Sequence, residues 1–348
     1  MIAALVNEIH LSPVYLLNDK SETEIIETIY FGGGTPSLLH DDDIENLLTA
    51  IKNNFLLSNE AEITIEANPD DINELKLLAW KKNGINRLSI GIQSFQQKDL
   101  EWMNRAHNAA QAVDSILLAK KSDFNNFSVD LIYGTPGLTD EEWKMNVEQV
   151  INLGAPHIAC YALTVEPKTA LHKMIHLKKK VDIDTDQQAR QFLLLMKWMK
   201  DAGYEHYEIS NFAKPGYRSK HNSSYWQGKK YIGIGPSAHS YNGKSRRWNI
   251  ANNALYIQSI KNNIIPFEEE KLTNVERLNE YIMTSLRTME GLDLKIIETN
   301  FSIKERKRIE DTVADYINKK MIVYNNEKLI LTDEGKLFAD GIAADLFC

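Results

Sequence analysis

The feature that most constrains this chain is an alternation of strand-like and helix-like segments that continues through residue 213. Apolar, β-branched runs end at Gly, Pro or Asn, and each is followed by a stretch with helical periodicity. This alternation predicts right-handed βαβ units and a parallel sheet. The expected strands are 27–34, 61–69, 86–95, 127–137, 156–167 and 204–213, and the expected helices between them are 41–55, 72–84, 109–121, 140–154 and 186–203.

Polar residues on these runs favour a barrel over an open, doubly wound sheet. An open sheet covered by helices on both faces should consist of nearly continuous Val, Ile and Leu. Here Glu66, Ser89 and Asp130 alternate with apolar residues near the ends of their runs. Active sites of barrels lie at the carboxyl ends of the strands. We therefore expect an α/β fold, an incomplete, TIM-like (β/α) barrel of parallel strands with polar groups at its mouth.

The alternation ends after residue 214. Residues 214–249 are rich in Gly, Pro and aromatic residues, with one further strand-like core at 230–241, and the acidic run at 267–270 is interpreted as a helix face. Helical patterns then predominate, at 251–263, 273–291 and 303–321, before a hairpin expected to turn at Asn325–Asn326. The predicted domains are a barrel with its Gly- and aromatic-rich segment at 1–250 and a helical, winged-helix-like domain at 251–348.

Composition narrows the classes of function. The chain has 348 residues, with 40 Lys and Arg against 48 Asp and Glu and a net charge of −8, which argues against a protein built to bind nucleic acid. Its two cysteines, Cys160 and Cys348, are too few and too far apart for a disulfide framework or a CxxC metal site. Transmembrane runs of about 18 apolar residues and secretory signals are absent from the sequence. We therefore expect a cytoplasmic protein.

Three consecutive glycines, Gly32, Gly33 and Gly34, end the first run and precede Thr35 and Pro36. Glycines let a ligand approach backbone N–H groups closely, and Thr-Pro is typical of an N-cap and first helical position. Such a turn can bind an anion or a carboxylate. The spacing fits neither a nucleotide P-loop nor a Rossmann turn. A tight strand-to-helix turn without a ligand is the simpler alternative.

Polar side chains recur at the ends of the following runs. Glu66 can hold an amine or a pair of ribose hydroxyls, although a solvated carboxylate would look the same in the sequence. Gln93 and Asp130 can orient the polar edges of a ligand, and Arg105 can form a two-pronged bond to a carboxylate. Together with the glycine turn, these residues predict a small molecule bound at the barrel mouth.

A second cluster, at 221–239, lies in the irregular, glycine-rich segment. It contains His221 and His239 beside Tyr225 and Trp226. A neutral imidazole among aromatic residues can ligate or stack on a planar cofactor such as heme. A satisfied structural histidine is the commoner explanation for any single histidine. Both interpretations stay open at this point.

Eight segments, in order along the chain, resemble radical S-adenosylmethionine proteins related to oxygen-independent coproporphyrinogen III oxidase. They are YFGGGTPSLL, TIEANP, RLSIGIQSF, MNRAH, VDLIYGTPG, YALTVEP, YEISNFAKPGYRSKHNSSYW and YIGIGPSAHS. The resemblance extends over essentially the whole chain, and HNSSYW favours the HemW branch, whose members are regarded as heme chaperones. It implies an incomplete (β/α) barrel with a C-terminal helical domain.

The resemblance also implies site residues, position by position. Those implied for S-adenosylmethionine are Gly33, Gly34, Thr35, Glu66, Gln93, Arg105, Asp130 and, as a further neighbour, Thr164. His221 of HNSSYW is the candidate for heme contact. No residue is predicted to be catalytic, and no metal ligand is predicted.

The chain departs from the family in its cysteines. Members carry a CxxxCxxC loop whose three thiolates bind a [4Fe-4S] cluster, and this sequence contains no such loop. There are two explanations: the sequence is truncated, as a fragment or a gene model begun at an internal Met, or the protein has lost radical chemistry. The uncapped amphipathic helix at Met1 favours the first explanation. We therefore expect the cluster only in a full-length parent, and no reductive cleavage of S-adenosylmethionine by the chain as written.

Two functions of different classes follow from the resemblance. The first is a heme chaperone that binds heme or a related porphyrin together with S-adenosylmethionine and delivers heme to an acceptor protein, with peripheral contact to membrane-bound acceptors left open. The alternative is an oxygen-independent coproporphyrinogen III oxidase, an enzyme of porphyrin synthesis. A barrel that keeps a small-molecule pocket without either activity is a third. HNSSYW and the missing cysteine loop favour the chaperone, and whether the chain is an enzyme stays open.

Overall fold

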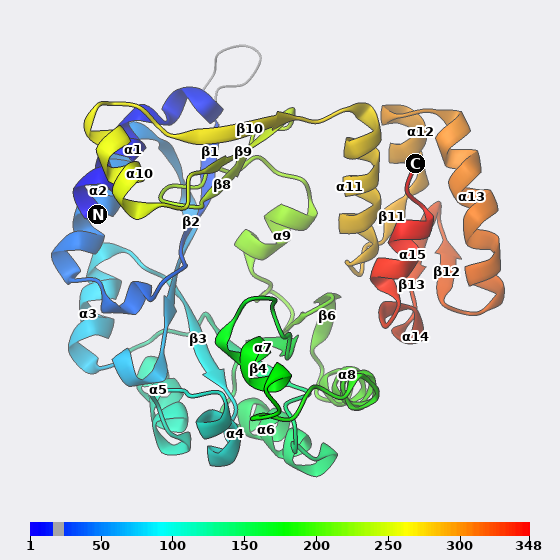
Figure 1. The fold of residues 1–348 in the computed structure, drawn as a ribbon, viewed down its shortest axis with the longest axis horizontal. Coiled ribbons are helices and arrows are strands. Elements are labelled where there is room, and N and C mark those ends of the chain that lie inside the picture. Colours follow the sequence, from blue (N-terminus) through cyan, green and yellow to red (C-terminus); the bar gives the residue numbers. More distant parts are fainter. Residues whose placement is uncertain (17–23) are drawn as a thin grey trace.

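The computed structural model describes residues 1–16 and 24–348 (Figure 1). The strands are β1 Ile25–Phe31, β2 Leu56–Ala67, β3 Arg87–Gln93, β4 Phe127–Tyr133, β5 His157–Ala162, β6 Glu205–Glu208, β7 Asn211–Ala213, β8 His239–Tyr241, β9 Ser245–Asn249, β10 Phe267–Lys271, β11 Leu292–Asp293, β12 Ile322–Asn325 and β13 Lys328–Leu331. The helices are α1 Ile2–Leu11, α2 Asp41–Asn54, α3 Glu74–Asn83, α4 Gln97–Trp102, α5 Ala109–Lys121, α6 Asp140–Asn152, α7 Ala170–His176, α8 Thr185–Asp201, α9 Lys220–Trp226, α10 Asn253–Lys261, α11 Asn274–Leu286, α12 Leu294–Asn300, α13 Ile303–Asn318, α14 Asp333–Lys336 and α15 Ala339–Asp345, with 3-10 turns η1 Pro13–Leu16, η2 Pro36–Leu38 and η3 Pro69–Asp71. Strands β1 to β5 and helices α2, α3, α5, α6 and α8 confirm the predicted alternation.

The central sheet has the order β1-β2-β3-β4-β5-β7-β6. Strands β1 to β5 are parallel neighbours, whereas β7 runs antiparallel to β5 and β6 antiparallel to β7. The prediction of one strand over 204–213 is therefore wrong, because the chain reverses at Ile209–Ser210 without the glycine or proline that usually marks a turn. The sheet curls into a half-barrel with β1 and β6 at its edges (Figure 1).

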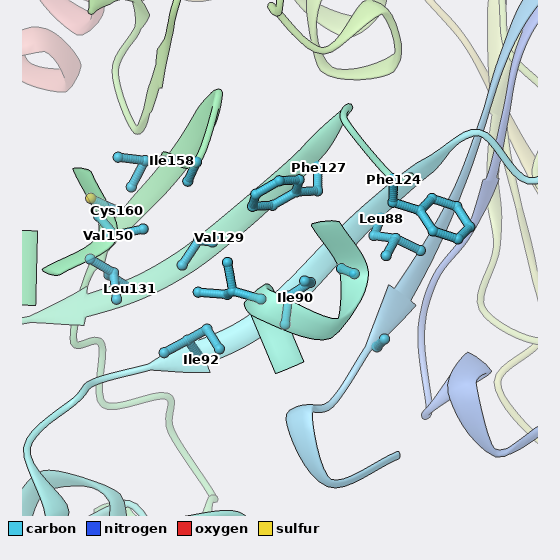
Figure 2. Packing of buried hydrophobic residues seen from close by; sticks show 14 of the residues in the cluster. Leu88, Ile90, Ile92, Phe124, Phe127, Val129, Leu131, Val150, Ile158 and Cys160 are labelled. Atoms are coloured by element: carbon cyan, nitrogen blue, oxygen red, sulfur yellow. The ribbon is translucent and has the colours of Figure 1, made fainter. Parts of the chain in front are cut away.

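One face of this sheet is apolar and is covered by helices. Leu88, Ile90 and Ile92 of β3 are fully buried and lie beside apolar residues of β4 and β5 (Figure 2). The covering helices add large side chains, including Trp80 of α3 and Trp143 of α6. Because successive side chains of a strand point to opposite faces, the polar residues of these strands lie on the inner, concave face.

Several helices around the barrel, among them α3, α5 and α6, begin or end at residues that cap their backbone. Asn108 and Thr139 form capping boxes with Gln111 and Glu142 at the starts of α5 and α6. Gly84, at a φ of +95°, ends α3 in the left-handed conformation that favours glycine. Local sequence therefore fixes where these helices begin and end, which explains why their bounds could be predicted closely.

A second, three-stranded sheet has the order β10-β9-β8. The strand-like core predicted at 230–241 contributes only β8 and an isolated bridge between Tyr231 and Tyr241. The acidic run at 267–270 lies in β10 rather than on a helix, and that interpretation is wrong, because Glu268 to Glu270 pair with β9 as an exposed edge strand. Edge strands exposed on both faces lack the apolar alternation that identifies a strand in a sequence.

The C-terminal part consists of α11 to α15 with the sheet β11-β13-β12. The predicted helices at 273–291 and 303–321 and the hairpin at 325–326 are present as α11, α13 and β12–β13. A separate apolar cluster, from Leu278 to Leu346, forms its core. The division into domains at 1–250 and 251–348 stays a prediction. Two contacts cross this boundary, because β10 pairs with β9 and α10 packs on α1. Within the described residues, no helix combines the length and apolar character needed to cross a membrane.

Candidate functional site

The concave face of the curled sheet is polar. Strand register places Thr28 beside Glu62, Tyr30 beside Thr64, and Glu66 beside Ser89. Helix α9 packs on this face against β1, inside the curve of the sheet (Figure 1). The polar residues that share the face are Thr28, Tyr30, Glu62, Thr64, Glu66, Arg87, Ser89, Ser128, Asp130 and His157.

The glycine turn lies against Glu66 at the mouth of the half-barrel. The N–H of Gly33 donates to Glu66 Oε2 at 3.2 Å, and the Tyr30 hydroxyl donates to Glu66 Oε1 at 2.9 Å. Gly33 and Gly34 have φ values of +74° and +65°, and open space lies where a Cβ would project from either. Thr35 is the N-cap of η2, without a side-chain capping bond. The turn thus presents backbone groups to open space beside a carboxylate.

Asp130 lies on β4 within the same cluster. Its carboxylate accepts hydrogen bonds from the hydroxyls of Ser89, at 3.1 and 3.3 Å, and of Ser128, at 3.2 Å. Burial raises the pKa of Asp130 to about 6, against the lowering effect of the two serines. The nearby Glu66 carboxylate also raises this pKa. Ser89, which pairs with Glu66 across the sheet and donates to Asp130, connects the two predicted residues.

Gln93 and Arg105 come together around Gly91. Arg105 donates through Nη2 to Asn68 Oδ1 at 2.8 Å and to the Gly91 carbonyl at 3.3 Å. A Cβ at Gly91 would lie 3.0 Å from the Gln93 amide nitrogen and 3.6 Å from Arg105 Nη2, so glycine leaves room for both side chains. The buried Nε of Arg105 has no hydrogen-bond partner among the described residues. Unpaired buried donors are uncommon in native proteins, and they mark positions where a water or an ion completes the hydrogen bonding.

Thr164 lies in the loop that follows the neighbouring strand β5. It is exposed, and its hydroxyl donates to the Ala162 carbonyl at 3.3 Å. The structure therefore brings together the glycine turn, Glu66, Asp130, Gln93 and Arg105 at neighbouring strand ends. Among the described residues, no hydrogen bond joins Thr164 to them.

His221 lies on α9, so the interpretation of HNSSYW as an irregular segment is wrong. Helix α9 begins with Ser219 as its N-cap, and the Glu62 carboxylate accepts from the N–H groups of Lys220 at 3.1 Å and His221 at 3.0 Å. A carboxylate from β2 thus holds the first turn of a helix that is distant in the sequence. Sequence periodicity cannot reveal such a tertiary cap.

The His221 imidazole is held on several sides. Its Nδ1 lies 3.0 Å from the Thr28 hydroxyl, and its ring stacks on Tyr30 with centroids 4.6 Å apart. The edge of Tyr225 closes a third side at 5.1 Å. Burial lowers the pKa of His221 to about 4, although Glu62 acts against this. The imidazole is therefore neutral at pH 7, and Nε2 has no hydrogen-bond partner among the described residues.

Sequence reasoning missed three residues of this arrangement: Thr28, Tyr30 and Glu62. Glu62 precedes Glu66 by four positions, so the period of two that identified Glu66 also places Glu62 on the same face. Tyr30 and Thr28 follow the same period on β1. Strand alternation was therefore a signal for all three, but nothing local indicated that α9 would pack over them.

His239, the other histidine of the cluster, lies elsewhere. It is exposed on β8, with its ring 6.1 Å from that of Trp248. Together with Tyr231, Arg246 and Glu270, these residues line a shallow hollow of about 510 Å³ on the three-stranded sheet. The two histidines thus belong to different surroundings, linked by the ring contact of Tyr225 with Tyr231 at 4.8 Å.

The residues present fit S-adenosylmethionine better than an iron–sulfur cluster. Glu66, the open glycine turn and the unpaired Arg105 Nε match an amino acid that carries an ammonium and a carboxylate. Cys160, by contrast, is buried in the apolar cluster, and Cys348 is exposed beside Arg308. Within residues 1–16 and 24–348, no three His, Cys, Asp or Glu side chains are grouped to hold a metal ion. The two cysteines do not supply the three thiolates that a cluster requires.

Comparisons with known proteins agree with this architecture. Residues 14–150 match the model of the radical SAM superfamily, and residues 272–338 match that of the HemN C-terminal domain. The heme chaperone HemW of Lactococcus lactis is 33% identical over 314 residues, which cover 90% of this chain and 83% of that protein. The heme chaperones HemW of Bacillus subtilis and of Buchnera aphidicola from Acyrthosiphon pisum are 32% and 35% identical, and 84% and 85% of their lengths are covered.

A solved structure supports the fold. Coproporphyrinogen III oxidase (HemN) from Escherichia coli, a radical SAM enzyme, superposes with a TM-score of 0.83 over 99% of this chain and 82% of that chain. At 22% identity this likeness concerns the fold alone, and it confirms the prediction of a partial barrel with a helical C-terminal part. The identity to the HemW chaperones over more than four fifths of their lengths decides the family. This chain belongs to the HemW family of the radical SAM superfamily.

Proposed function

We propose that this chain is a heme chaperone that binds heme through His221 and delivers it to an acceptor protein, with S-adenosylmethionine bound at the glycine turn. The proposal is supported by the name that the curated relatives share and by the two clusters on the concave face. The acceptor, contact with membrane-bound acceptors and the cytoplasmic location stay predictions.

The observation that carries the heme proposal is the state of the His221 imidazole. Its pKa of about 4 keeps the ring neutral at pH 7, and a neutral imidazole is an axial ligand of heme iron. The Thr28 hydroxyl occupies Nδ1, and Nε2 has no hydrogen-bond partner in the part of the chain that the structure describes. Ligand histidines commonly have their second nitrogen held by such a partner, which fixes the ring orientation.

The S-adenosylmethionine proposal depends on complementary charges. We assign the ligand's ammonium to the Glu66 carboxylate and its carboxylate to the backbone of Gly33 and Gly34 and to Arg105. Asp130 and Gln93 line the same region, and Thr164 is retained only as a residue of the loop beside it. Bound S-adenosylmethionine supplies a cationic sulfonium and an adenosyl group.

The radical SAM superfamily implies a [4Fe-4S] cluster, and the proposal is confined to binding and transfer because the two cysteines of this chain do not fit one. The oxidase alternative would require chemistry at that cluster. Chromatography of the porphyrin products tests this alternative. If this chain converted coproporphyrinogen III to protoporphyrinogen IX, the oxidase function would replace the chaperone proposal.

Heme titration tests the assignment of His221. We expect the wild-type chain to shift the Soret band of added heme and His221→Ala to lose at least tenfold in affinity, since loss of an axial ligand removes a coordination bond. His172→Ala is the matched control, because His172 is exposed on α7 and none of the described side chains around His221 contacts it. An unchanged Soret band in His221→Ala would contradict the assignment.

Calorimetry tests the S-adenosylmethionine site separately. We expect binding to weaken at least tenfold in Glu66→Ala, because the ammonium loses its carboxylate partner. Glu60→Ala serves as the control, since Glu60 is exposed on the same strand. Equal affinity in both variants would remove Glu66 from the proposed site without affecting the heme assignment.

A further inference from the structure

Tyr30 contacts both proposed ligand sites at once. Its hydroxyl donates to Glu66 Oε1 at 2.9 Å, beside the glycine turn. Its ring stacks on His221 with centroids 4.6 Å apart and planes inclined by 20°. Tyr30 lies on β1, just before the glycine turn, whereas His221 follows 191 positions later on α9. One rigid side chain therefore joins the two clusters of the concave face.

The protonation of Tyr30 suits this contact. Burial raises the pKa of Tyr30, and the Glu66 and Asp130 carboxylates raise it further. The hydroxyl therefore stays protonated at neutral pH and acts as a donor to Glu66. The Glu66 carboxylate accepts from Tyr30 at Oε1 and from the Gly33 N–H at Oε2, and it keeps acceptor sites for a further donor. A cationic amine that binds there neutralises part of the carboxylate charge, which weakens the hydrogen bond from the neutral Tyr30 hydroxyl.

We propose that Tyr30 couples the two sites, so that a ligand with a cationic amine bound at Glu66 weakens heme binding at His221. The inference rests on the proposed function and specifies how that site is regulated. While the Tyr30 hydroxyl is bound to Glu66, the phenol ring is fixed against the imidazole. An amine bound to the Glu66 carboxylate weakens the hydrogen bond from the Tyr30 hydroxyl and so loosens the ring that orients His221.

The remaining contacts explain why the effect falls on orientation rather than on the protonation of His221. Thr28 holds Nδ1, and Glu62 fixes the first turn of α9 through the backbone. Neither residue hydrogen-bonds to Glu66. Among these contacts, the flat face of the imidazole is supported by Tyr30. Loss of that support increases the freedom of the ring, which lowers the affinity of a ligand that needs one orientation.

The first test is a double-mutant cycle on heme affinity, which needs no second ligand. We expect Tyr30→Phe and Glu66→Ala each to weaken heme binding by about 5- to 10-fold, since each deletes the same hydrogen bond. The double variant should then be no weaker than either single variant. Glu66→Gln, which keeps an acceptor for the hydroxyl, should recover most of the affinity lost in Glu66→Ala.

The second test adds S-adenosylmethionine as the probe. In the wild-type chain, saturating S-adenosylmethionine should raise the dissociation constant for heme by about 5- to 10-fold, and heme should weaken S-adenosylmethionine binding by the same factor because coupling is reciprocal. In Tyr30→Phe this mutual effect should vanish. Tyr324→Phe is the matched control, because it deletes a tyrosine–glutamate hydrogen bond, to Glu327, on the distant hairpin β12–β13.

The outcomes separate the inference from the function on which it rests. Failure of the wild-type chain to bind heme would overturn the proposed function. Heme binding with additive effects of Tyr30→Phe and Glu66→Ala would overturn the coupling alone. Persistence of the S-adenosylmethionine effect in Tyr30→Phe would do the same. If S-adenosylmethionine fails to bind, the cycle on heme affinity still decides whether Tyr30 links Glu66 to His221.

Discussion

At the scale of single residues, burial sets the protonation of the concave face. It raises the pKa of Asp130 and of Tyr30 and lowers that of His221, and each shift favours the neutral form. A neutral imidazole and a protonated phenol are the forms needed to bind iron and to donate to Glu66. The donor and acceptor groups of Tyr30 and His221 are therefore set in the protein without a bound ligand.

Asp130 gives a test of this conclusion through the pH dependence of stability. Its pKa rises from 3.8 to about 6 on folding, so between these values the folded state binds more protons than the unfolded state. Stability then falls as the pH rises through this window. Asp130→Asn, which cannot titrate, should remove this part of the fall, about 2 kcal/mol across the window. Urea unfolding of both proteins at a series of pH values measures the difference, and a constant difference would contradict the raised pKa.

At the scale of elements, α9 depends on its tertiary contacts. It spans Lys220–Trp226 and has no fully buried residue, and isolated helices of this length are not stable in water. Its position is held by the Glu62 carboxylate and by the packing of His221 on β1. Helix α9, which carries His221, is thus stabilised by its packing against the barrel.

Replacing Glu62 should therefore loosen α9. Glu62 is 4% exposed, and Glu62→Ala leaves the N–H groups of Lys220 and His221 without their acceptor. We expect a loss of about 2 kcal/mol in the free energy of unfolding and faster hydrogen exchange at these two amides. Glu60→Ala, on the exposed part of β2, should change neither quantity. Unaltered exchange in Glu62→Ala would show that α9 is held by other contacts.

Two nearby glycines of the C-terminal part, Gly335 and Gly341, differ in the space that a Cβ atom would have. A Cβ on Gly335 would lie 2.0 Å from the Met321 carbonyl oxygen, whereas a Cβ on Gly341 of α15 meets no atom within 4 Å. Gly335→Ala should destabilise the protein by at least about 2 kcal/mol, because the backbone at Met321 must move to make room for the new Cβ atom. Gly341→Ala should stabilise it by about 0.5–1 kcal/mol through helix propensity. Thermal unfolding of both variants tests the pair, and equal midpoints would contradict the packing around Gly335.

At the scale of the whole molecule, two apolar cores meet through few side chains. Ile209, between β6 and β7, packs against the C-terminal cluster as well as the barrel cluster. Leu337, after α14, packs against the barrel cluster in return. Lys336 adds a contact of 3.0 Å with His206 on β6. Backbone and charged contacts also join the parts, among them the bond from the Met289 N–H to the Tyr207 carbonyl and the ion pair of Arg218 with Glu290. The apolar share of the coupling comes from Ile209 and Leu337.

Removing these apolar contacts should divide the unfolding transition. We expect Ile209→Ala combined with Leu337→Ala to weaken the coupling between the parts by about 2 kcal/mol, since each half-buried side chain contributes about 1 kcal/mol. Scanning calorimetry should then show two transitions, or a van't Hoff enthalpy well below the calorimetric one. Ile303→Ala is the control, because Ile303 is 70% exposed. A single sharp transition in the double variant would show that other contacts join the parts.

Local sequence determined most of the barrel. The apolar runs of β1 to β5, the capping boxes of α5 and α6, and the hairpin near Asn326 are set by residues within one or two turns of each other. The polar alternation on β2, β3 and β4 likewise predicted a mouth containing Glu66, Gln93 and Asp130. These features depend on periodicity and on short-range hydrogen bonds, which a sequence displays directly.

Only the tertiary structure decided the rest. The reversal between β6 and β7 has no turn residue, β10 is an exposed edge strand without alternation, and α9 is too short to form alone. The stack of Tyr30 on His221 joins segments separated by most of the barrel, as do the bonds from Glu62 to α9. Such contacts gain free energy only when distant segments pack together, so no local pattern encodes them. The sequence by itself thus determined strands β1 to β5, the helices between them and the polar residues at the mouth. The packing of α9 into the curve of the sheet brought the two proposed sites into contact.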